Sequence, residues 1–231
     1  MPISFDAASS FDATSAVSTV SWNHTVGIGA NRILLVAPGF RTTASSAVVV
    51  STITYGGMGL TRAVTSTDQS GVRTKIQEDL WYLLNPASGA SSIHVTYSNS
   101  SLAYIHGAFG VSYSGTTGIG NVAASTGASS SPSVAITLTA AGSWAVGAVR
   151  SNAAVAFTTV SGETRRAFSN VFDFGGIVDV APGTSGSNTL NMTGGASQPF
   201  VFVALELLPV SVGDGGGPDL ARSRLMTGIG R

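Results

Sequence analysis

Histidine is scarce in this 231-residue chain, and its three histidines are the first side chains to examine for chemistry. His94 and His106 lie in consecutive runs that alternate apolar and polar residues, so on paired strands they would be able to face each other. A zinc site would need a third ligand, for which His24 and Asp173 are the candidates. Because the spacing of these residues matches no metal motif, we predict no metal ion and no cofactor.

Carboxylates and serines are the other groups with catalytic potential. Glu78 and Asp79 are adjacent, so on a strand they point to opposite faces and do not form the acid pair of a glycosidase. Glu206 interrupts an apolar run, and we expect it to face solvent or a subunit interface, or to pair with an arginine. Serine is abundant, but no G-x-S-x-G elbow occurs. We therefore predict no catalytic residue and no enzymatic activity.

Composition excludes several classes of protein. Charged residues make up 10% of the chain, against about 25% in ordinary domains, and Lys75 is the only lysine. Without a basic surface to neutralise phosphates, nucleic acid is not an expected partner. The longest apolar run, 200–212, falls short of the roughly 20 residues of a membrane span, and MPISFDAASSFD does not resemble a signal peptide. With no cysteine, a disulfide framework is impossible.

Short apolar runs separated by Gly, Ser, Asn and Pro predict strands along most of the chain. The expected strands are 32–40, 48–55, 76–84, 92–97, 104–113, 133–139, 143–149, 171–180 and 200–207. We expect 133–139 and 143–149 to form a hairpin, and the Ser/Gly/Ala-rich stretch 118–131 to be a long loop between two halves. This pattern predicts an all-β fold, an antiparallel two-sheet β-sandwich of jelly-roll type.

The composition changes after Pro209, where VSVGDGGGPDLARSRLMTGIGR begins. We predict one sandwich domain over 1–209 and a Gly-rich hinge with a docking arm over 210–231. The arm combines apolar and basic side chains that suit the groove of a partner. The predicted docking residues are Leu220, Arg222, Arg224, Leu225, Met226, Ile229 and Arg231.

Four strings in the chain resemble a recurrent β-sandwich module, jelly-roll or immunoglobulin-like, of phage virion proteins and bacterial surface proteins. They are SWNHTVGIGANRILLVAPGF, STITYGGMGLTRA, EDLWYLLNPASGASSIHVTYS and HGAFGVSYSG, and the similarity extends over about residues 15–208. The motifs have structural explanations: Trp22 and Trp81 are expected in the core, Asn31 in a tight turn, and Gly56-Gly57 at positive φ. The resemblance implies a fold and carries no assigned chemistry.

Taken together, these features predict a non-enzymatic virion structural protein: a capsid decoration, head or tail subunit that assembles with copies of itself and with other virion proteins. It would be found in the virion, which is assembled in the host cytoplasm, or alternatively at an extracellular surface. The alternative function is a carbohydrate-binding surface module, in which exposed Tyr82, Tyr97 or Tyr113 would stack on glycans.

Overall fold

The computed structural model describes most of the chain. The described residues are 1–12, 17–43, 48–71, 74–98, 107–151, 157–160, 162–169, 175–181, 185–194 and 196–210. All of their regular structure is β-strand. None of the described residues forms a helix that is long and apolar enough to cross a bilayer.

In the described part of the chain, eighteen strands form four sheets, which we name A to D. The strands are β1 (Ser4–Phe11), β2 (Thr19–Val26), β3 (Ile33–Ala37), β4 (Phe40–Thr43), β5 (Val50–Tyr55), β6 (Met58–Gly59), β7 (Thr61–Gly71), β8 (Thr74–Leu84), β9 (Gly89–Tyr97), β10 (Ala108–Ser114), β11 (Thr116–Ser129), β12 (Ser133–Leu138), β13 (Trp144–Ser151), β14 (Thr158–Thr159), β15 (Glu163–Ser169), β16 (Gly175–Val180), β17 (Gly186–Thr193) and β18 (Gln198–Pro209). Sheet A has the order β1-β10-β3-β8-β4, with β7 also on β8, and sheet B has β2-β9-β5-β6. Sheet C has the order β11-β18-β13-β16-β15, and sheet D has β12-β17-β14.

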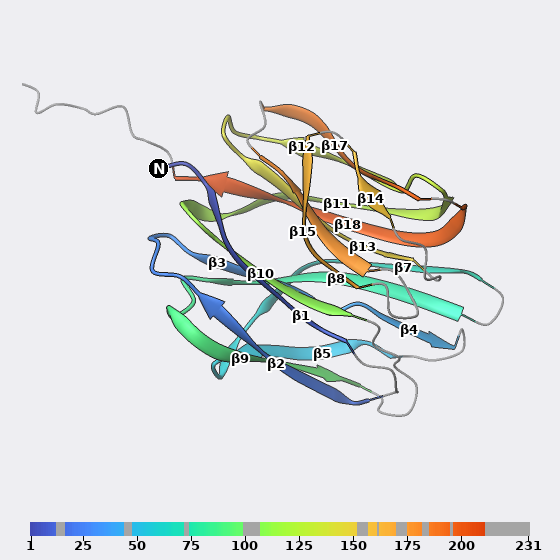
Figure 1. The fold of residues 1–231 in the computed structure, drawn as a ribbon, viewed down its shortest axis with the longest axis horizontal. Coiled ribbons are helices and arrows are strands. Elements are labelled where there is room, and N and C mark those ends of the chain that lie inside the picture. Colours follow the sequence, from blue (N-terminus) through green and yellow to red (C-terminus); the bar gives the residue numbers. More distant parts are fainter. Residues whose placement is uncertain are drawn as a thin grey trace, which may run out of the picture.

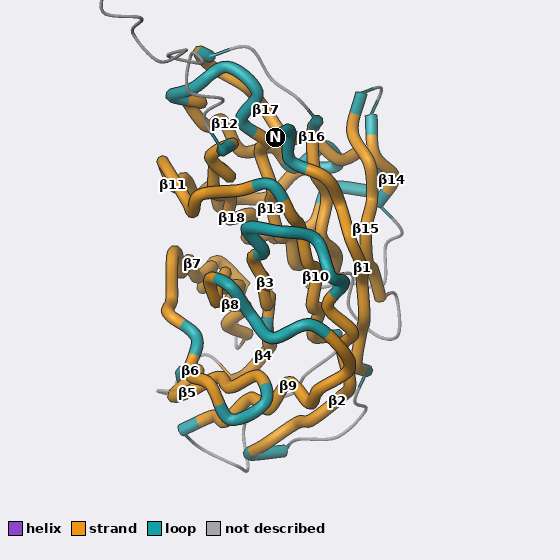
Figure 2. Tube along the Cα trace, turned by 90° about the vertical axis from the view of Figure 1, so that its left-hand side faces the viewer, coloured by secondary structure: helices purple, strands orange, loops and turns teal. Residues whose placement is uncertain are grey.

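The four sheets stack as layers in the order B, A, C and D, as both views show (Figures 1 and 2). Sheets A and B enclose one apolar core and form a first sandwich, residues 4–114. Sheets C and D enclose another and form a second sandwich, residues 116–209. A third core lies between sheets A and C and joins the two sandwiches. The expected antiparallel β-sandwich is thus confirmed, with four sheets in place of two.

Hydrophobic patterning decides which sheets are central. The central strand β13 is buried at every position, and so is β3, because each packs against a core on both faces. In the outer sheet, β2 alternates exposed and buried residues along its whole length. Continuous apolar runs therefore mark the inner layers and alternating runs mark the outer ones.

The two sandwiches repeat one strand plan. The order β1-β10-β3-β8 of sheet A matches β11-β18-β13-β16 of sheet C, and β2-β9-β5 matches β12-β17-β14. The equivalent strands also follow one another in the same order along the chain. Contacts between the halves are reciprocal, since β1 lies near β15 while β11 lies near β7. This is the arrangement of an isologous dimer with both partners in one chain.

Register supports the same equivalence. Gly89 begins β9 opposite Val26, the last residue of β2, and Gly186 begins β17 opposite Leu138, the last residue of β12. Both glycines have positive φ, 103° and 124°, a conformation that favours glycine. When GASSIHVT of β9 is aligned with GSNTLNMT of β17 on these glycines, only the first and last residues are identical. This low identity explains why the repeat is inconspicuous in the sequence.

Two sequence predictions about the second half were wrong. The stretch 118–131 is not a loop, because its first twelve residues belong to β11, which pairs with β18 along its length. Its small Ser, Gly and Ala side chains are those of an edge strand, alternately half-buried and exposed. The predicted hairpin is also absent: β12 pairs with β17 in sheet D, whereas β13 pairs with β16 and β18 in sheet C. The intervening turn crosses between layers.

Several local predictions are confirmed. Asn31 adopts a φ of 54°, and Gly56 and Gly57 adopt φ of 55° and 84°. Trp22 and Trp81 lie in the core of the first sandwich. These features could be predicted because they depend on the type of the residue itself: turn residues for positive φ, and large apolar rings for the core.

Candidate functional site

A buried ion pair joins the two sandwiches. Arg150 of β13 donates from Nε to Oε2 of Glu78 in β8 at 2.9 Å, and both side chains are fully buried. Arg150 also donates from Nη2 to the carbonyl of Gly107 at 2.5 Å. Glu78 and Arg150 thus connect sheet A to sheet C across the shared core. Unlike apolar packing, which has no preferred direction, this ion pair joins two specific side chains.

Glycines leave the space that this pair occupies. A Cβ atom at Gly39 would lie 2.1 Å from both Glu78 Oε2 and Arg150 Nε, well inside any allowed contact. Burial raises the pKa of Glu78 to about 7, although Arg150 acts in the opposite direction. Because the folded-state pKa exceeds the usual one, this carboxyl favours the folded state at low pH, and the contribution declines as pH rises from about 4.5 to 7.

A second polar cluster joins the sandwiches at the opposite end of β10. The Tyr113 hydroxyl donates to Asp179 Oδ2 at 2.8 Å. Arg166 donates from Nε to the same oxygen at 2.6 Å. The Tyr113 ring meets Trp144 edge to face, with centroids 5.9 Å apart. Tyr113 belongs to the first sandwich, whereas Asp179, Arg166 and Trp144 belong to the second, so this cluster also fixes how sheet A lies on sheet C.

Within the first sandwich, His24 lies in a chain of hydrogen bonds with a single direction. Ser112 uses its only hydroxyl hydrogen on Asp6, so it accepts from His24 Nε2, and Nδ1 of the neutral ring is an acceptor. The Ser9 hydroxyl therefore donates to His24 Nδ1 at 2.8 Å and accepts from Trp22 Nε1 at 3.0 Å. His24 Nε2 then donates to Ser112 Oγ at 3.1 Å. Ser112 donates in turn to Asp6 Oδ2 at 2.7 Å.

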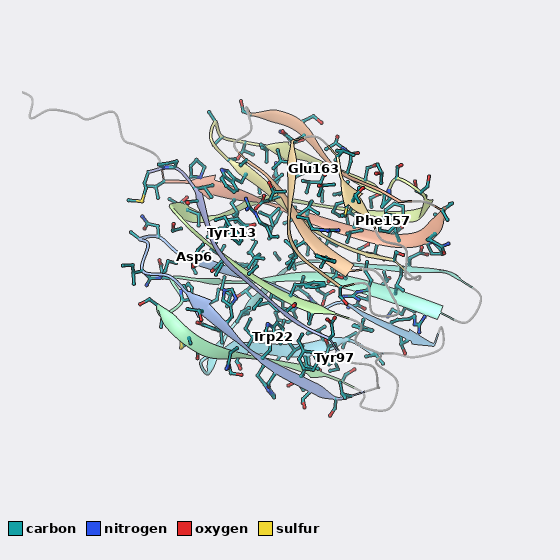
Figure 3. The ribbon with its side chains drawn as sticks, viewed as in Figure 1. Asp6, Trp22, Tyr97, Tyr113, Phe157 and Glu163 are labelled. Carbon is teal, nitrogen blue, oxygen red and sulfur yellow. The ribbon has the colours of Figure 1, made fainter. Side chains whose placement is uncertain are left out.

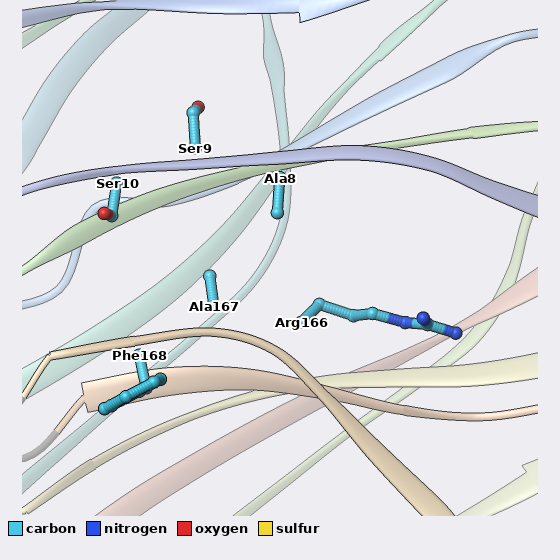
Figure 4. A pocket seen from close by; sticks show the side chains of 6 residues that line it. All are labelled: Ala8, Ser9, Ser10, Arg166, Ala167 and Phe168. Carbon is cyan, nitrogen blue, oxygen red and sulfur yellow. The ribbon is translucent and has the colours of Figure 1, made fainter.

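Burial lowers the pKa of His24 to about 4, although the nearby Asp6 charge raises it. The imidazole is therefore neutral at pH 7, as its accepting Nδ1 requires. Figure 4 shows the Ser9 side chain on the face of β1 away from the nearby depression. The chain of bonds connects β1, β2 and β10, and we assign it a structural role.

In the second sandwich, Glu206 lies where β11, β18 and the end of β12 meet, the equivalents of β1, β10 and β2. It is fully buried, and accepts hydrogen bonds from the backbone of Thr139 at 2.6 Å and of Asn121 at 3.1 Å. Burial would raise the pKa of Glu206, but the hydrogen bonds outweigh it and lower that pKa. The expectation of a solvent-facing, interfacial or arginine-paired Glu206 was therefore wrong, because backbone N–H groups provide its partners inside the second sandwich.

The other predicted chemical groups are dispersed. Glu78 and Asp79 do point to opposite faces of β8: Glu78 bonds Arg150, whereas Asp79 accepts from Gln77 at 3.0 Å. His94 is exposed on the outer face of sheet B, and His24 is buried beneath it. His106 and Asp173 lie outside the described residues. Among the described residues, no cluster of three His, Asp or Glu side chains is placed to hold a metal ion.

Two of the tyrosines considered for glycan stacking are buried. Tyr97 and Tyr113 are 3% and 0% exposed, and Figure 3 shows them among the layers. Their hydroxyls bond Pro38 O and Asp179 inside the protein. Tyr82 is half-buried in β8. The prediction that Tyr97 and Tyr113 are exposed was wrong. Tyr113 lies in sheet A, which is covered on both faces, and Tyr97 lies on the face of outer sheet B that packs on the core of the first sandwich.

The residues that line a shallow depression come from two edge strands. Ala8 to Ser10 of β1 form one wall, and Arg166 to Phe168 of β15 form the other, around about 240 Å³ (Figure 4). Phe168 is 47% exposed. No local sequence pattern indicates this site, because it forms where β1 of sheet A lies near β15 of sheet C.

The predicted docking residues of the arm, from Leu220 to Arg231, all lie outside the described residues. The last described strand, β18, ends at Pro209, where the arm was expected to begin. No family model, no curated protein and no solved structure matches the chain.

Proposed function

We propose that the chain is a non-enzymatic structural subunit of a virion, a capsid decoration, head or tail protein that assembles in repeated copies. One observation carries the proposal: strands β2, β5, β6, β9, β12, β14 and β17, which form sheets B and D, contain no Asp, Glu, Lys or Arg. The charged residues of the described strands all lie in sheets A and C.

Uncharged outer faces suit contact with neighbours. Exposed side chains there are uncharged and mostly small or polar, as at Thr25 and Thr137, and Met58 of β6 is also exposed. Covering such groups requires no burial of unpaired charge, which is the costly step in forming an interface. Sheets B and D form opposite ends of the stack (Figure 2), so one subunit has a face for each of two neighbours.

The polar groups with catalytic potential support the same proposal. Glu78, Asp179 and Glu206 are bonded to partners inside the protein. A glycan-binding module has less support, because the tyrosines expected to stack on sugars are buried or half-buried.

The proposal is tested on particles released from cells that encode the chain. Gradient-purified particles are analysed by mass spectrometry and by antibody labelling in the electron microscope. We expect many copies per particle at regular positions, and particles without the chain would refute the proposal. A variant lacking residues 210–231 should remain folded but fail to join particles; normal incorporation of that variant would refute the docking role of the arm.

A further inference from the structure

The depression between β1 and β15 is an opening at the edge of the shared core. β1 is the terminal strand of sheet A and β15 that of sheet C, so each has one edge without a partner among the described strands. Ala8 and Ser10 project toward β15, as Figure 4 shows. Edge strands with free backbone groups are the usual docking places for an extended peptide.

The internal repeat shows what occupies the equivalent opening on the other side. There β7, the counterpart of β15, lies against β11 and β18 and places Ala63 and Val64 against the shared core. Among the described residues, β15 contacts β1 less extensively than β7 contacts β11, and the depression remains between β1 and β15. A short extended segment would fill it.

The walls of the depression favour an uncharged occupant. Ala8, Ser10 and Ala167 are small, so they leave room for larger side chains. The charge of Arg166 is already engaged by Asp179. The Arg165 guanidinium lies 3.8 Å from the centre of the Phe168 ring, so its charge is directed toward an aromatic face.

We infer that the depression binds residues 225–229, Leu-Met-Thr-Gly-Ile, of a second copy of the chain. This segment is uncharged and carries three large apolar side chains within five residues. It follows Pro209 by 15 residues, a tether that reaches up to about 50 Å, enough to cross to a neighbour. The inference rests on the proposed function, since it names the receptor for the arm through which subunits would attach.

The absence of cysteine from the chain allows a clean test by disulfide trapping in the full-length protein. Ala8→Cys is combined with Met226→Cys and oxidised at low protein concentration. The control combines Met226→Cys with Val122→Cys. Val122 lies opposite Leu205 in β11, as Ala8 lies opposite Val111 in β1, and it is 46% exposed. The control thiol is therefore accessible at the equivalent place.

We expect disulfide-linked dimers from the Ala8→Cys pair, at least fivefold more than from the control. A cross-linked monomer would overturn the assignment to a second copy, and equal trapping by the two pairs would overturn the assignment of the depression. Particle labelling separates these failures from that of the proposed function. Absent trapping with normal incorporation refutes only the docking inference, whereas efficient trapping by a chain absent from particles refutes the virion role.

Discussion

The two sandwiches share one strand plan, yet they stabilise the same corner with different chemistry. In the first, the exposed Asp6 of β1 accepts from the backbone of Gly27, just after β2, and from Ser112 of β10. In the second, the buried Glu206 of β18 accepts from Thr139, just after β12, and from Asn121 of β11. Each sandwich thus has a carboxylate at the place where three equivalent strands meet, supplied by the first of these strands in one half and by the last in the other.

The connection between the sandwiches gives the largest expected effect. Arg150→Ala leaves the Glu78 carboxyl buried without its cation, and we expect a loss of about 3–5 kcal/mol in the free energy of unfolding. The double variant Glu78→Leu/Arg150→Met removes both charges and should lose less than Arg150→Ala. Urea denaturation measures both, and a double variant less stable than the single one would contradict a costly unpaired charge.

His24 makes the stability of the first sandwich depend on pH, whereas the second sandwich has no histidine at the equivalent position. Its pKa is lowered to about 4 in the folded protein from an unfolded value of 6.5. The unfolded chain therefore binds the extra proton between these values, and stability from this group is full above pH 6.5 and is lost as pH falls toward 4. The loss amounts to about 3 kcal/mol.

His24→Ile tests this, since Ile136 holds the equivalent register position in β12. We expect the variant to lose less stability than the wild type between pH 6.5 and 4, measured by denaturation at each pH. Parallel curves for the two proteins would show that His24 does not titrate as its burial requires.

Glu206→Ala should cost more than Asp6→Ala. Removal of Glu206 leaves the N–H groups of Thr139 and Asn121 without their acceptor in a part-buried corner, for a loss of about 2–3 kcal/mol. Asp6 is exposed, so water replaces it and the loss is about 1 kcal/mol. Thermal and urea unfolding compare the two, and equal losses would show that the corners do not differ in burial.

Tyr113→Phe should have the smallest effect at the shared core. It removes one hydrogen bond to Asp179 while Arg166 still pairs with that carboxylate. We expect a loss of about 1 kcal/mol, with the ring packing on Trp144 unchanged. A loss above about 3 kcal/mol would mean that the hydroxyl, and not the ion pair, orients Asp179.

Local sequence signals predicted much of the fold but not its duplication. The apolar run RILLVAPGF correctly predicted a buried strand, and SIHVTY a half-buried one, because patterning reports directly on burial. The strand β11 was missed, since its Ser, Gly and Ala side chains have the composition of a loop and only pairing with β18 makes them a strand.

The polar partners were still less predictable. Glu206 was recognised as unusual, but its donors lie 67 and 85 residues away in the chain. The sequence around Arg150 does not indicate a buried ion pair, because the pairing of Arg150 with Glu78 depends on how sheet C packs on sheet A. Such contacts arise from the packing of layers, which no local pattern encodes.

Under the proposed function, the uncharged outer sheets B and D are contact faces between copies of the chain. Sedimentation velocity of Thr25→Glu/Thr137→Glu, which adds a charge to each outer sheet, tests this most directly. The control is Ser4→Glu/Thr61→Glu, with two charges at exposed positions of sheet A. We predict that the wild type and the control sediment as assemblies larger than the 23.2 kDa monomer, while the outer-sheet variant sediments as a folded monomer. Identical sedimentation of all three proteins would show that the outer sheets are not contact faces.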